Sequence, residues 1–134
     1  MSYVLLVEDN PDNASMMIRL LESVGLEVQH AVEGMHGVRM ARLRRPSLIL
    51  MDFNLPDIDG RTLVVTLKKQ LGGADAPPIV AVTARTGAIE QVLAAKFGCS
   101  AFINKPFDPQ EFLDIVQGLL PSSHSSDTTY REVP

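Results

Sequence analysis

The sequence predicts an α/β fold in which a five-stranded parallel sheet carries helices on both of its faces. Strand-like and helix-like segments alternate five times between residues 3 and 120. Residues 48–51 and 79–82 are all apolar and are followed by Asp52 and Thr83, which is typical of strands that are covered on both faces. The composition agrees, because a chain of 134 residues that is 46% hydrophobic can bury one core but is too short for two domains.

The expected elements follow from the apolar periodicity of each segment. Strands are expected at residues 3–7, 26–32, 47–52, 79–83 and 101–104. Helices are expected at residues 11–24, 34–45, 61–71, 88–97 and 109–119. In this order each strand is followed by a helix, as a sheet of parallel strands requires.

Proline and glycine indicate where the helices begin and end. Pro11 and Pro109 stand at positions where the first turn of a helix tolerates proline, and Asp108 is the expected N-cap before Pro109. Gly25 and Gly98 are expected to end their helices, because glycine readily adopts the left-handed conformation of a C-terminal cap.

Composition also excludes several classes of protein. The net charge is −4 and the isoelectric point is about 5.3, with no basic block, so direct binding to nucleic acid is not expected. Cys99 is the single cysteine, which fits a reducing cytoplasm, and no apolar run reaches membrane-spanning length. Residues 1–120 are expected to form one domain, and residues 121–134, which have little to bury, a flexible tail.

Arginines are concentrated near the end of the second expected helix, at Arg39, Arg42, Arg44 and Arg45. We expect them on the outer face of that helix. A solvated face with favourable charges near the helix C-terminus explains them more simply than a docking patch.

Polar side chains stand at the carboxyl ends of four of the expected strands. Glu8 and Asp9 follow the first strand, Asp52 ends the third, Thr83 ends the fourth and Lys105 follows the fifth. Burying an unpaired carboxylate costs several kcal/mol, so the third strand must end at Asp52. In a parallel sheet these ends share one edge, and that edge is where open α/β sheets bind ligands.

The chemistry of this set points to phosphate and a divalent cation. Three carboxylates at one edge repel one another, and a bound cation relieves the repulsion. Oxygen donors favour Mg²⁺ over zinc, since neither Cys99 nor a histidine is expected at this edge. The hydroxyl of Thr83 and the ammonium of Lys105 suit phosphoryl oxygens. A single strand-end Asp or Thr is usually a cap; the whole set favours a site.

The chain resembles the receiver domain of two-component response regulators over about residues 3–120. The resemblance is carried by Val7-Glu8-Asp9-Asn10, Leu50-Met51-Asp52, Leu55-Pro56, Gly60, Val82-Thr83-Ala84 and Lys105-Pro106-Phe107. It implies a doubly wound, flavodoxin-like (βα)₅ fold with strand order 2-1-3-4-5. It also implies a signalling domain that acts on no separate substrate.

The resemblance assigns a role to each site residue. Asp52 would accept a phosphoryl group from the phosphohistidine of a histidine kinase or a histidine phosphotransfer protein. Mg²⁺ would be held by Glu8, Asp9, Asp52 and the backbone carbonyl of Asn54. Thr83 and Lys105 would bind the phosphoryl oxygens.

The resemblance also implies how the signal would leave the site. Thr83 and Phe102 would form a switch, and Pro106 would follow a cis peptide bond. The surface formed by residues 88–97, 101–104 and 109–119 would bind a downstream protein. Phe102 stands where the family often has tyrosine and cannot form a hydrogen bond. The chain is expected to be a stand-alone receiver or one excised from a longer protein, monomeric or weakly dimeric.

Two other functions could use the same residues. A haloacid-dehalogenase-like phosphatase also uses an aspartyl phosphate, a threonine and a lysine, but it needs a second aspartate where this chain has Asn54. A phosphorylation-independent protein-binding module could carry the acidic edge incidentally. Binding of Mg²⁺ at millimolar concentration would distinguish the receiver from such a module.

Overall fold

The strands form one parallel sheet in the computed structural model of the chain, which describes residues 2–84 and 88–120. The strand order is β2-β1-β3-β4-β5, as predicted. The strands are β1 (Val4–Val7), β2 (Val28–Ala31), β3 (Leu48–Met51), β4 (Ile79–Thr83) and β5 (Ala101–Asn104). All four neighbouring pairs are parallel, so the carboxyl ends of all the strands point to the same edge.

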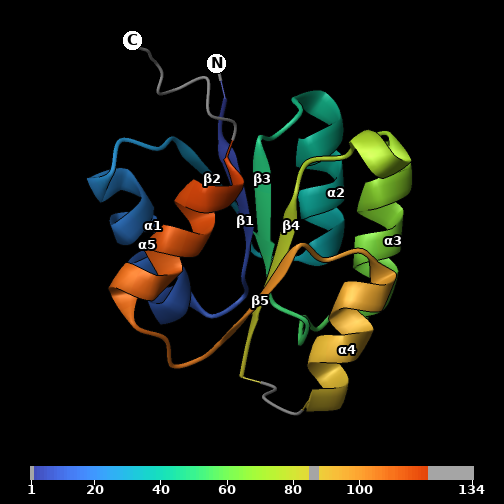
Figure 1. The fold of residues 1–134 in the computed structure, drawn as a ribbon. Coiled ribbons are helices and arrows are strands. Elements are labelled where there is room, and N and C mark those ends of the chain that lie inside the picture. Colours follow the sequence, from blue (N-terminus) through green and yellow to red (C-terminus); the bar gives the residue numbers. More distant parts are fainter. Residues whose placement is uncertain (1, 85–87, 121–134) are drawn as a thin grey trace, which may run out of the picture.

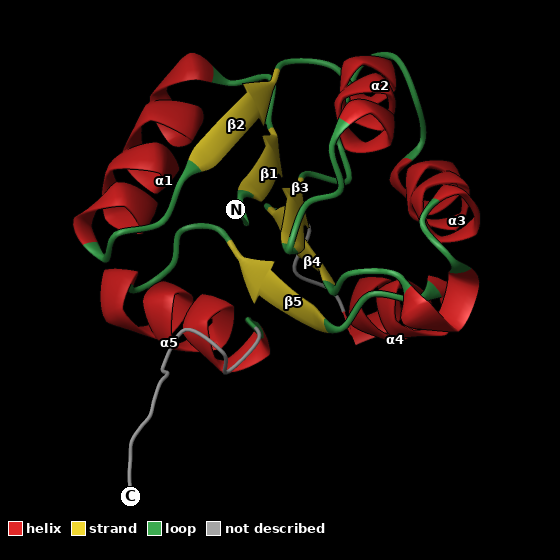
Figure 2. Cartoon of the chain, turned by 90° about the horizontal axis from the view of Figure 1, so that it is seen from above, coloured by secondary structure: helices red, strands yellow, loops and turns green. Residues whose placement is uncertain are grey.

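Helices cover both faces of this sheet. They are α1 (Pro11–Ser23), α2 (Gly34–Leu43), α3 (Gly60–Gln70), α4 (Ala88–Phe97) and α5 (Pro109–Leu119), with a short 3₁₀ helix, η1 (Gly73–Asp75). Figures 1 and 2 show α1 and α5 on one face of the sheet and α2, α3 and α4 on the other. The predicted fold class is therefore confirmed.

The core consists of two layers because alternate residues of each strand face opposite sides. In β1, Val4 and Leu6 pack with buried residues of α1 and α5, whereas Leu5 and Val7 pack with buried residues of α2 and α3. Each of these strand residues is at most 1% exposed. Burial on both faces explains why the strands lack polar alternation.

The helix ends agree with their local sequence signals. The side chain of Asn10 accepts a hydrogen bond from the Asn13 amide at 2.9 Å, and Asp108 accepts one from the Glu111 amide at 3.3 Å. Gly25 and Gly98 have φ angles of 83° and 117°. The second strand is shorter than predicted, however, and α2 ends at Leu43 rather than at residue 45.

The early end of α2 corrects the expected position of two arginines. Arg44 has extended backbone angles, its guanidinium lies 4.5 Å from the centre of the Tyr3 ring, and it pairs with Glu27 at 2.9 and 3.2 Å. Arg45 donates to the carbonyl oxygens of Leu71, at 2.7 Å, and Asp75. Both lie after the end of α2 and bind residues of neighbouring segments, so the prediction that they lie on the outer face of the helix is wrong.

The predicted tail, residues 121–134, lies outside the described residues, so the division of the chain at residue 120 stays a prediction. Among the helices that the structure describes, none is long and apolar enough to cross a membrane.

Candidate functional site

Three carboxylates meet at the carboxyl edge of the sheet, where the sequence predicts them. One ligand oxygen from each of Glu8, Asp9 and Asp52 lies within 4.8 Å of the others. Glu8 is 1% exposed and Asp52 is 7% exposed, whereas Asp9 is exposed to solvent. The group therefore combines two buried acids with one at the mouth of the site.

The register of the central strands brings these acids together. Val7 of β1 pairs with Met51 of β3, so the residues that follow them, Glu8 and Asp52, lie side by side. The Asp52 amide donates to the Val7 carbonyl at 3.1 Å and continues the ladder to the carboxylate itself. The backbone thus fixes the position of both buried acids.

Lys105 approaches these carboxylates from the connection between β5 and α5. Its Nζ lies 2.7 Å from Glu8 Oε1 and 3.0 Å from Asp52 Oδ2. Burial opposes the charge of Lys105, but the hydrogen bonds to Glu8 and Asp52 outweigh it and raise the pKa of the ammonium group. Lys105 is therefore a cation at neutral pH. The Lys105–Pro106 peptide bond is cis.

Glu8 is the most enclosed of the three acids. Burial raises the pKa of its carboxyl group, and the hydrogen bonds from Lys105 and from the Asn10 amide, at 3.1 Å, compensate only in part. The carboxyl group therefore depends on a nearby positive charge to remain ionised.

The charges and donor atoms of the site fit a divalent cation. Three ionised carboxylates and the Lys105 ammonium leave two negative charges, and every candidate ligand is oxygen. Oxygen donors are the ligands that Mg²⁺ prefers. One histidine does lie closer than the sequence suggested, since His30 Nε2 is 2.8 Å from the Glu8 carbonyl oxygen. This contact is to the backbone, and His30 is not part of the carboxylate group.

Asn54 links Asp52 to Thr83 through hydrogen bonds. Its backbone amide donates to Asp52 Oδ1 at 2.8 Å, and its side-chain amide donates to Thr83 Oγ1 at 3.1 Å. Thr83 itself is fully buried at the end of β4. The sequence suggested a role for the Asn54 carbonyl only. The contact with Thr83 was missed because it depends on how two separate strands end.

Phe102 lies outside this polar group, on β5. Its ring meets the ring of Phe53 edge-on, with centroids 6.5 Å apart and planes at 84°. Both side chains are half-buried. Phe53 directly follows Asp52. The predicted switch residue, Phe102, therefore contacts the loop that begins at the site.

The same loop also holds the start of α2. Asp57 accepts hydrogen bonds from the amides of Gly34 and Met35, both at 2.9 Å, and thereby caps the helix in place of Glu33, whose side chain makes no cap bond. A slight burial opposes the charge of Asp57, but these backbone bonds outweigh it and lower the pKa of its carboxyl group. Ile58 packs so closely that a Cβ on Gly34 would lie 2.2 Å from its Cγ2.

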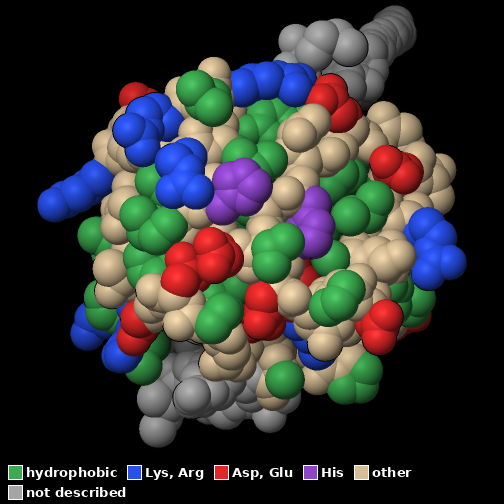
Figure 3. All heavy atoms as spheres, turned by 180° about the vertical axis from the view of Figure 1, so that it is seen from behind, with side chains coloured by type: hydrophobic (Ala, Val, Ile, Leu, Met, Phe, Trp, Pro, Cys, Tyr) green, Lys and Arg blue, Asp and Glu red, His purple; other side chains and the backbone are tan. Residues whose placement is uncertain are grey.

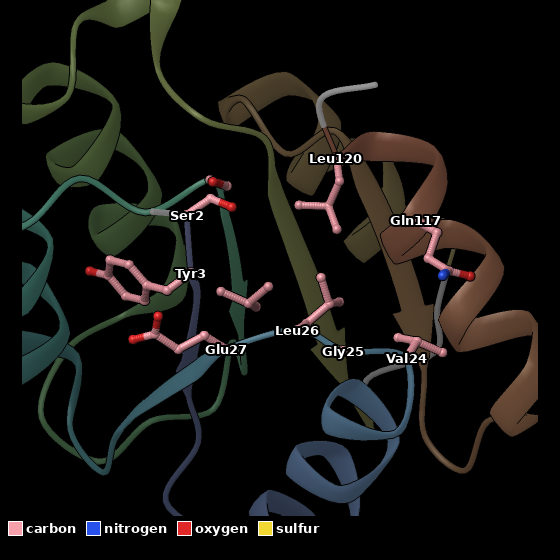
Figure 4. A pocket seen from close by; sticks show the side chains of 10 residues that line it. Ser2, Tyr3, Val24, Gly25, Leu26, Glu27, Gln117 and Leu120 are labelled. Atoms are coloured by element: carbon pink, nitrogen blue, oxygen red, sulfur yellow. The ribbon is translucent and has the colours of Figure 1, made fainter. Parts of the chain in front are cut away.

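A pocket of about 440 Å³ opens elsewhere, at the amino edge of the sheet. Figure 4 shows Val24, Leu26 and Leu120 around it, from the α1–β2 connection and the end of α5. Its acidic residue, Glu27, is already paired with Arg44. The pocket is distant from Asp52, and we assign no chemistry to it.

Known proteins with this arrangement were found by comparing sequence and structure. Residues 4–117 match the family model described as the response regulator receiver domain. The polar-differentiation response regulator DivK of Brucella anthropi is 32% identical over 117 residues, which are 87% of this chain and 94% of DivK.

A longer relative and a solved structure add to this likeness. The DNA-binding dual master transcriptional regulator RpaA of Synechocystis is 32% identical over 120 residues, 90% of this chain but 49% of RpaA, so this chain spans about half of that protein. The receiver domain of the sensor histidine kinase PA1611 of Pseudomonas aeruginosa has a TM-score of 0.79 and 33% identity, covering 88% of this chain and 96% of its own. That structure has a magnesium ion coordinated in the active-site cleft. This chain belongs to the response regulator receiver domain family, and its acidic pocket fits a phosphoacceptor site.

Proposed function

We propose that Asp52 is the phosphoacceptor of this receiver domain. The observation that carries the proposal is the convergence of Lys105, two further carboxylates and the Asn54–Thr83 pair on this one side chain. Asp52 is the carboxylate with contacts to both an ammonium group and the Asn54 amide. The donor would be the phosphohistidine of a histidine kinase or of a histidine phosphotransfer protein.

The transfer is a substitution at phosphorus. A carboxylate oxygen of Asp52 forms the new O–P bond as the P–N bond to the histidine breaks, and the imidazole of the donor takes up a proton. Lys105 and Thr83 would bind the phosphoryl oxygens, whose charge must be stabilised during transfer. Lys105 would have to exchange part of its contact with Glu8 or Asp52 for this contact.

Mg²⁺ would be held by Glu8, Asp9, Asp52 and the Asn54 carbonyl. When bound, it would neutralise the charge of the carboxylates and of the incoming phosphoryl oxygens. The chain itself positions the reacting groups. The ends of β1 and β3 position the acids, and the connection after β5 positions Lys105.

The phosphorylated form would act by binding a downstream protein. Thr83 would turn toward the phosphoryl group, Phe102 would occupy the space behind it, and the surface of α4, β5 and α5 would change. We place the domain in the cytoplasm, where its phosphodonor would be, and propose that it acts on no separate substrate. We also propose that the domain neither contacts nucleic acid directly nor inserts into a membrane.

The phosphatase alternative has less support. That chemistry needs a proton-transferring acid two residues after the nucleophile, and the amide of Asn54 cannot transfer a proton and already donates to Thr83. The incidental acidic edge of a plain binding module would not need Lys105 to form ion pairs with two of its acids.

The test is phosphorylation by a small phosphodonor, with and without Mg²⁺. We expect Mg²⁺-dependent addition of one phosphoryl group to the wild-type chain and none to Asp52→Asn, which keeps the shape but removes the nucleophilic oxygen. Asp57→Asn, five residues away in the same loop, is the matched control and should still be labelled. Undiminished labelling of Asp52→Asn would refute the assignment.

A further inference from the structure

The helices α2 and α3 differ in charge from the helices on the other face of the sheet. Neither contains Asp or Glu. Their basic residues are Arg39, Arg42, Arg61, Lys68 and Lys69. By contrast, α5 contains Glu111 and Asp114 and no Lys or Arg. From behind, Lys and Arg side chains gather toward the left of the molecule, on the side that α2 occupies in this direction (Figure 3).

Three of these cations are available for a partner. Arg61 pairs with Asp59 at 3.1 Å, and the stem of Lys68 lies over Gly98, where an added Cβ would come within 2.9 Å of Lys68 Cε. Arg39, Arg42 and Lys69 are exposed, and no ion pair joins them to the side chains of residues 2–84 and 91–120.

Apolar side chains lie between these charges. On α2, Met35 and Leu43 flank Arg39 at a spacing of four residues, which places all three on one face of the helix. Leu43 is 87% exposed and Met35 is 43% exposed. On α3, Val65 is 37% exposed and lies four residues before Lys69.

The two helices present these side chains as one surface. They lie side by side in the fold, and the side chain of Gln70 on α3 donates to the Val38 carbonyl of α2 at 3.0 Å. We call the α2–α3 surface the set Met35, Arg39, Arg42, Leu43, Val65 and Lys69. It has exposed apolar atoms bordered by cations, and no acidic residue comes from either helix.

We propose that the α2–α3 surface binds an acidic amphipathic helix of a partner protein. A third helix can lie along two packed helices with its apolar face against theirs, here against Met35, Leu43 and Val65. Carboxylates beside that apolar face would pair with Arg39 and Arg42, and arginine pairs with carboxylates in two parallel hydrogen bonds. Arginine and methionine are also enriched at protein interfaces.

The same charges disfavour a second copy of this chain as the occupant. A two-fold contact through this surface would place Arg39 and Arg42 of both copies against each other. A contact between this surface and the acidic α5 of another copy would be head-to-tail, and such contacts form open chains unless their rotation closes. An acidic helix of another protein would pair with these arginines without placing like charges together and without forming open chains of copies.

The probe is a synthetic helical peptide with leucine along one face and glutamate on both sides of it, titrated into the full chain at low salt. We expect amide chemical-shift changes in residues 35–43 and 61–70. A peptide with lysine in place of glutamate should cause none. Arg39→Glu should weaken binding about tenfold or more, because it replaces a charge pair with a repulsion. Arg19→Glu, the same change at an exposed position on α1, should leave the affinity unchanged.

Leu43→Ala tests the apolar part of the surface, and it should weaken peptide binding without lowering thermal stability because Leu43 is almost fully exposed. Equal affinities of Arg39→Glu and Arg19→Glu, or no binding of the glutamate peptide, would overturn the proposal. So would binding restricted to phosphatidylserine vesicles, to duplex DNA or to a second copy of the chain. Labelling of Asp52 by a small phosphodonor should be the same in Arg39→Glu, so this proposal and the proposed phosphoacceptor can fail separately.

Discussion

Three carboxylates share the site with one ammonium group, and Asp9 is the acid that Lys105 does not contact. Glu8 and Asp52 are buried and paired with Lys105, whereas Asp9 is exposed. The side chain of Asp9 therefore adds negative charge to the group without a compensating ion pair among the described residues. Removing the Asp9 charge should therefore affect cation binding and folding stability in opposite directions.

We expect Asp9→Asn to weaken Mg²⁺ binding and to slow phosphorylation, because the variant removes one of the charges that a divalent cation would neutralise. Without Mg²⁺ the variant should be as stable as the wild type or more stable, since like-charge repulsion falls. Magnesium titration and urea unfolding in the absence of Mg²⁺ measure the two effects. A loss of stability with normal phosphorylation would instead make Asp9 a structural cap.

At this scale the sequence was most informative where position along a strand determines position in space. Glu8, Asp52, Thr83 and Lys105 could be grouped because parallel strands bring their carboxyl ends to one edge. The pairing of Lys105 with Glu8, residues 97 apart in sequence, could not be predicted. This ion pair depends on the path of the chain between β5 and α5, and no pattern in the sequence predicts that path.

Among the elements, α2 is held at its N-terminus by a residue from another part of the chain. Asp57 accepts hydrogen bonds from the amides of Gly34 and Met35, and the Ile58 side chain packs against Gly34. The loop that starts at Asp52 is therefore attached both to α2 and, through Phe53, to Phe102. A change at Asp52 can therefore reach both α2 and β5 through this one loop.

Asp57→Ala should lower the free energy of unfolding by about 0.5–2 kcal/mol at neutral pH, the usual cost of losing an N-terminal cap. The hydrogen bonds lower the pKa of Asp57 below its ordinary value of 3.8, so the folded state favours the ionised form. The stabilisation is therefore present above pH 3.8 and is lost as the pH falls through the lowered pKa.

Urea unfolding of wild type and Asp57→Ala across this pH range measures that difference. The two curves should be separated at neutral pH and converge in acid. Asp75→Ala, which removes an exposed carboxylate in η1, is the control and should show a smaller difference at neutral pH. A separation for Asp57→Ala that does not change with pH would contradict the cap.

Helix ends were predictable where the cap is local in sequence. Asn10 caps α1 and Asp108 caps α5, and both act on amides three residues ahead. The cap formed by Asp57 was not predicted, because the amides that it binds lie more than twenty residues earlier in the sequence. Arg44 was misplaced for a related reason, since its stacking on Tyr3 and its pairing with Glu27 favour an end of α2 before the arginine.

For the whole molecule, the question is how a change at one sheet edge reaches a surface. Thr83 ends β4, and Phe102 lies on β5, whose register pairs Phe102 with Ala81 and Asn104 with Thr83. Moving Thr83 toward a phosphoryl group would thus act next to Phe102. Phosphorylation needs only to bias an existing equilibrium, and a shift from ~1:99 to ~99:1 requires about 5.5 kcal/mol.

Phe102→Ala should separate phosphorylation from its readout. Labelling of Asp52 should stay near normal, because the Phe102 ring supplies no charge, donor or acceptor to the site, while the α4–β5–α5 surface should no longer distinguish the phosphorylated from the unphosphorylated form. Amide chemical shifts with and without beryllofluoride, a phosphoryl mimic, measure this in wild type and variant. In the wild type we expect changes in residues 88–104 as well as near Asp52. Silence of those residues in the wild type would show that this surface is not the output.

The central claim is that the phosphoryl group is carried by Asp52, and locating it chemically is the most direct test. Phosphorylation with Mg²⁺ and a small phosphodonor, followed by borohydride reduction, converts an aspartyl phosphate to homoserine, which peptide mass spectrometry can place in the sequence. We predict homoserine at residue 52 and unmodified aspartate at Asp9, Asp57 and Asp59. Homoserine at any of those residues, with Asp52 unmodified, would contradict the proposed site.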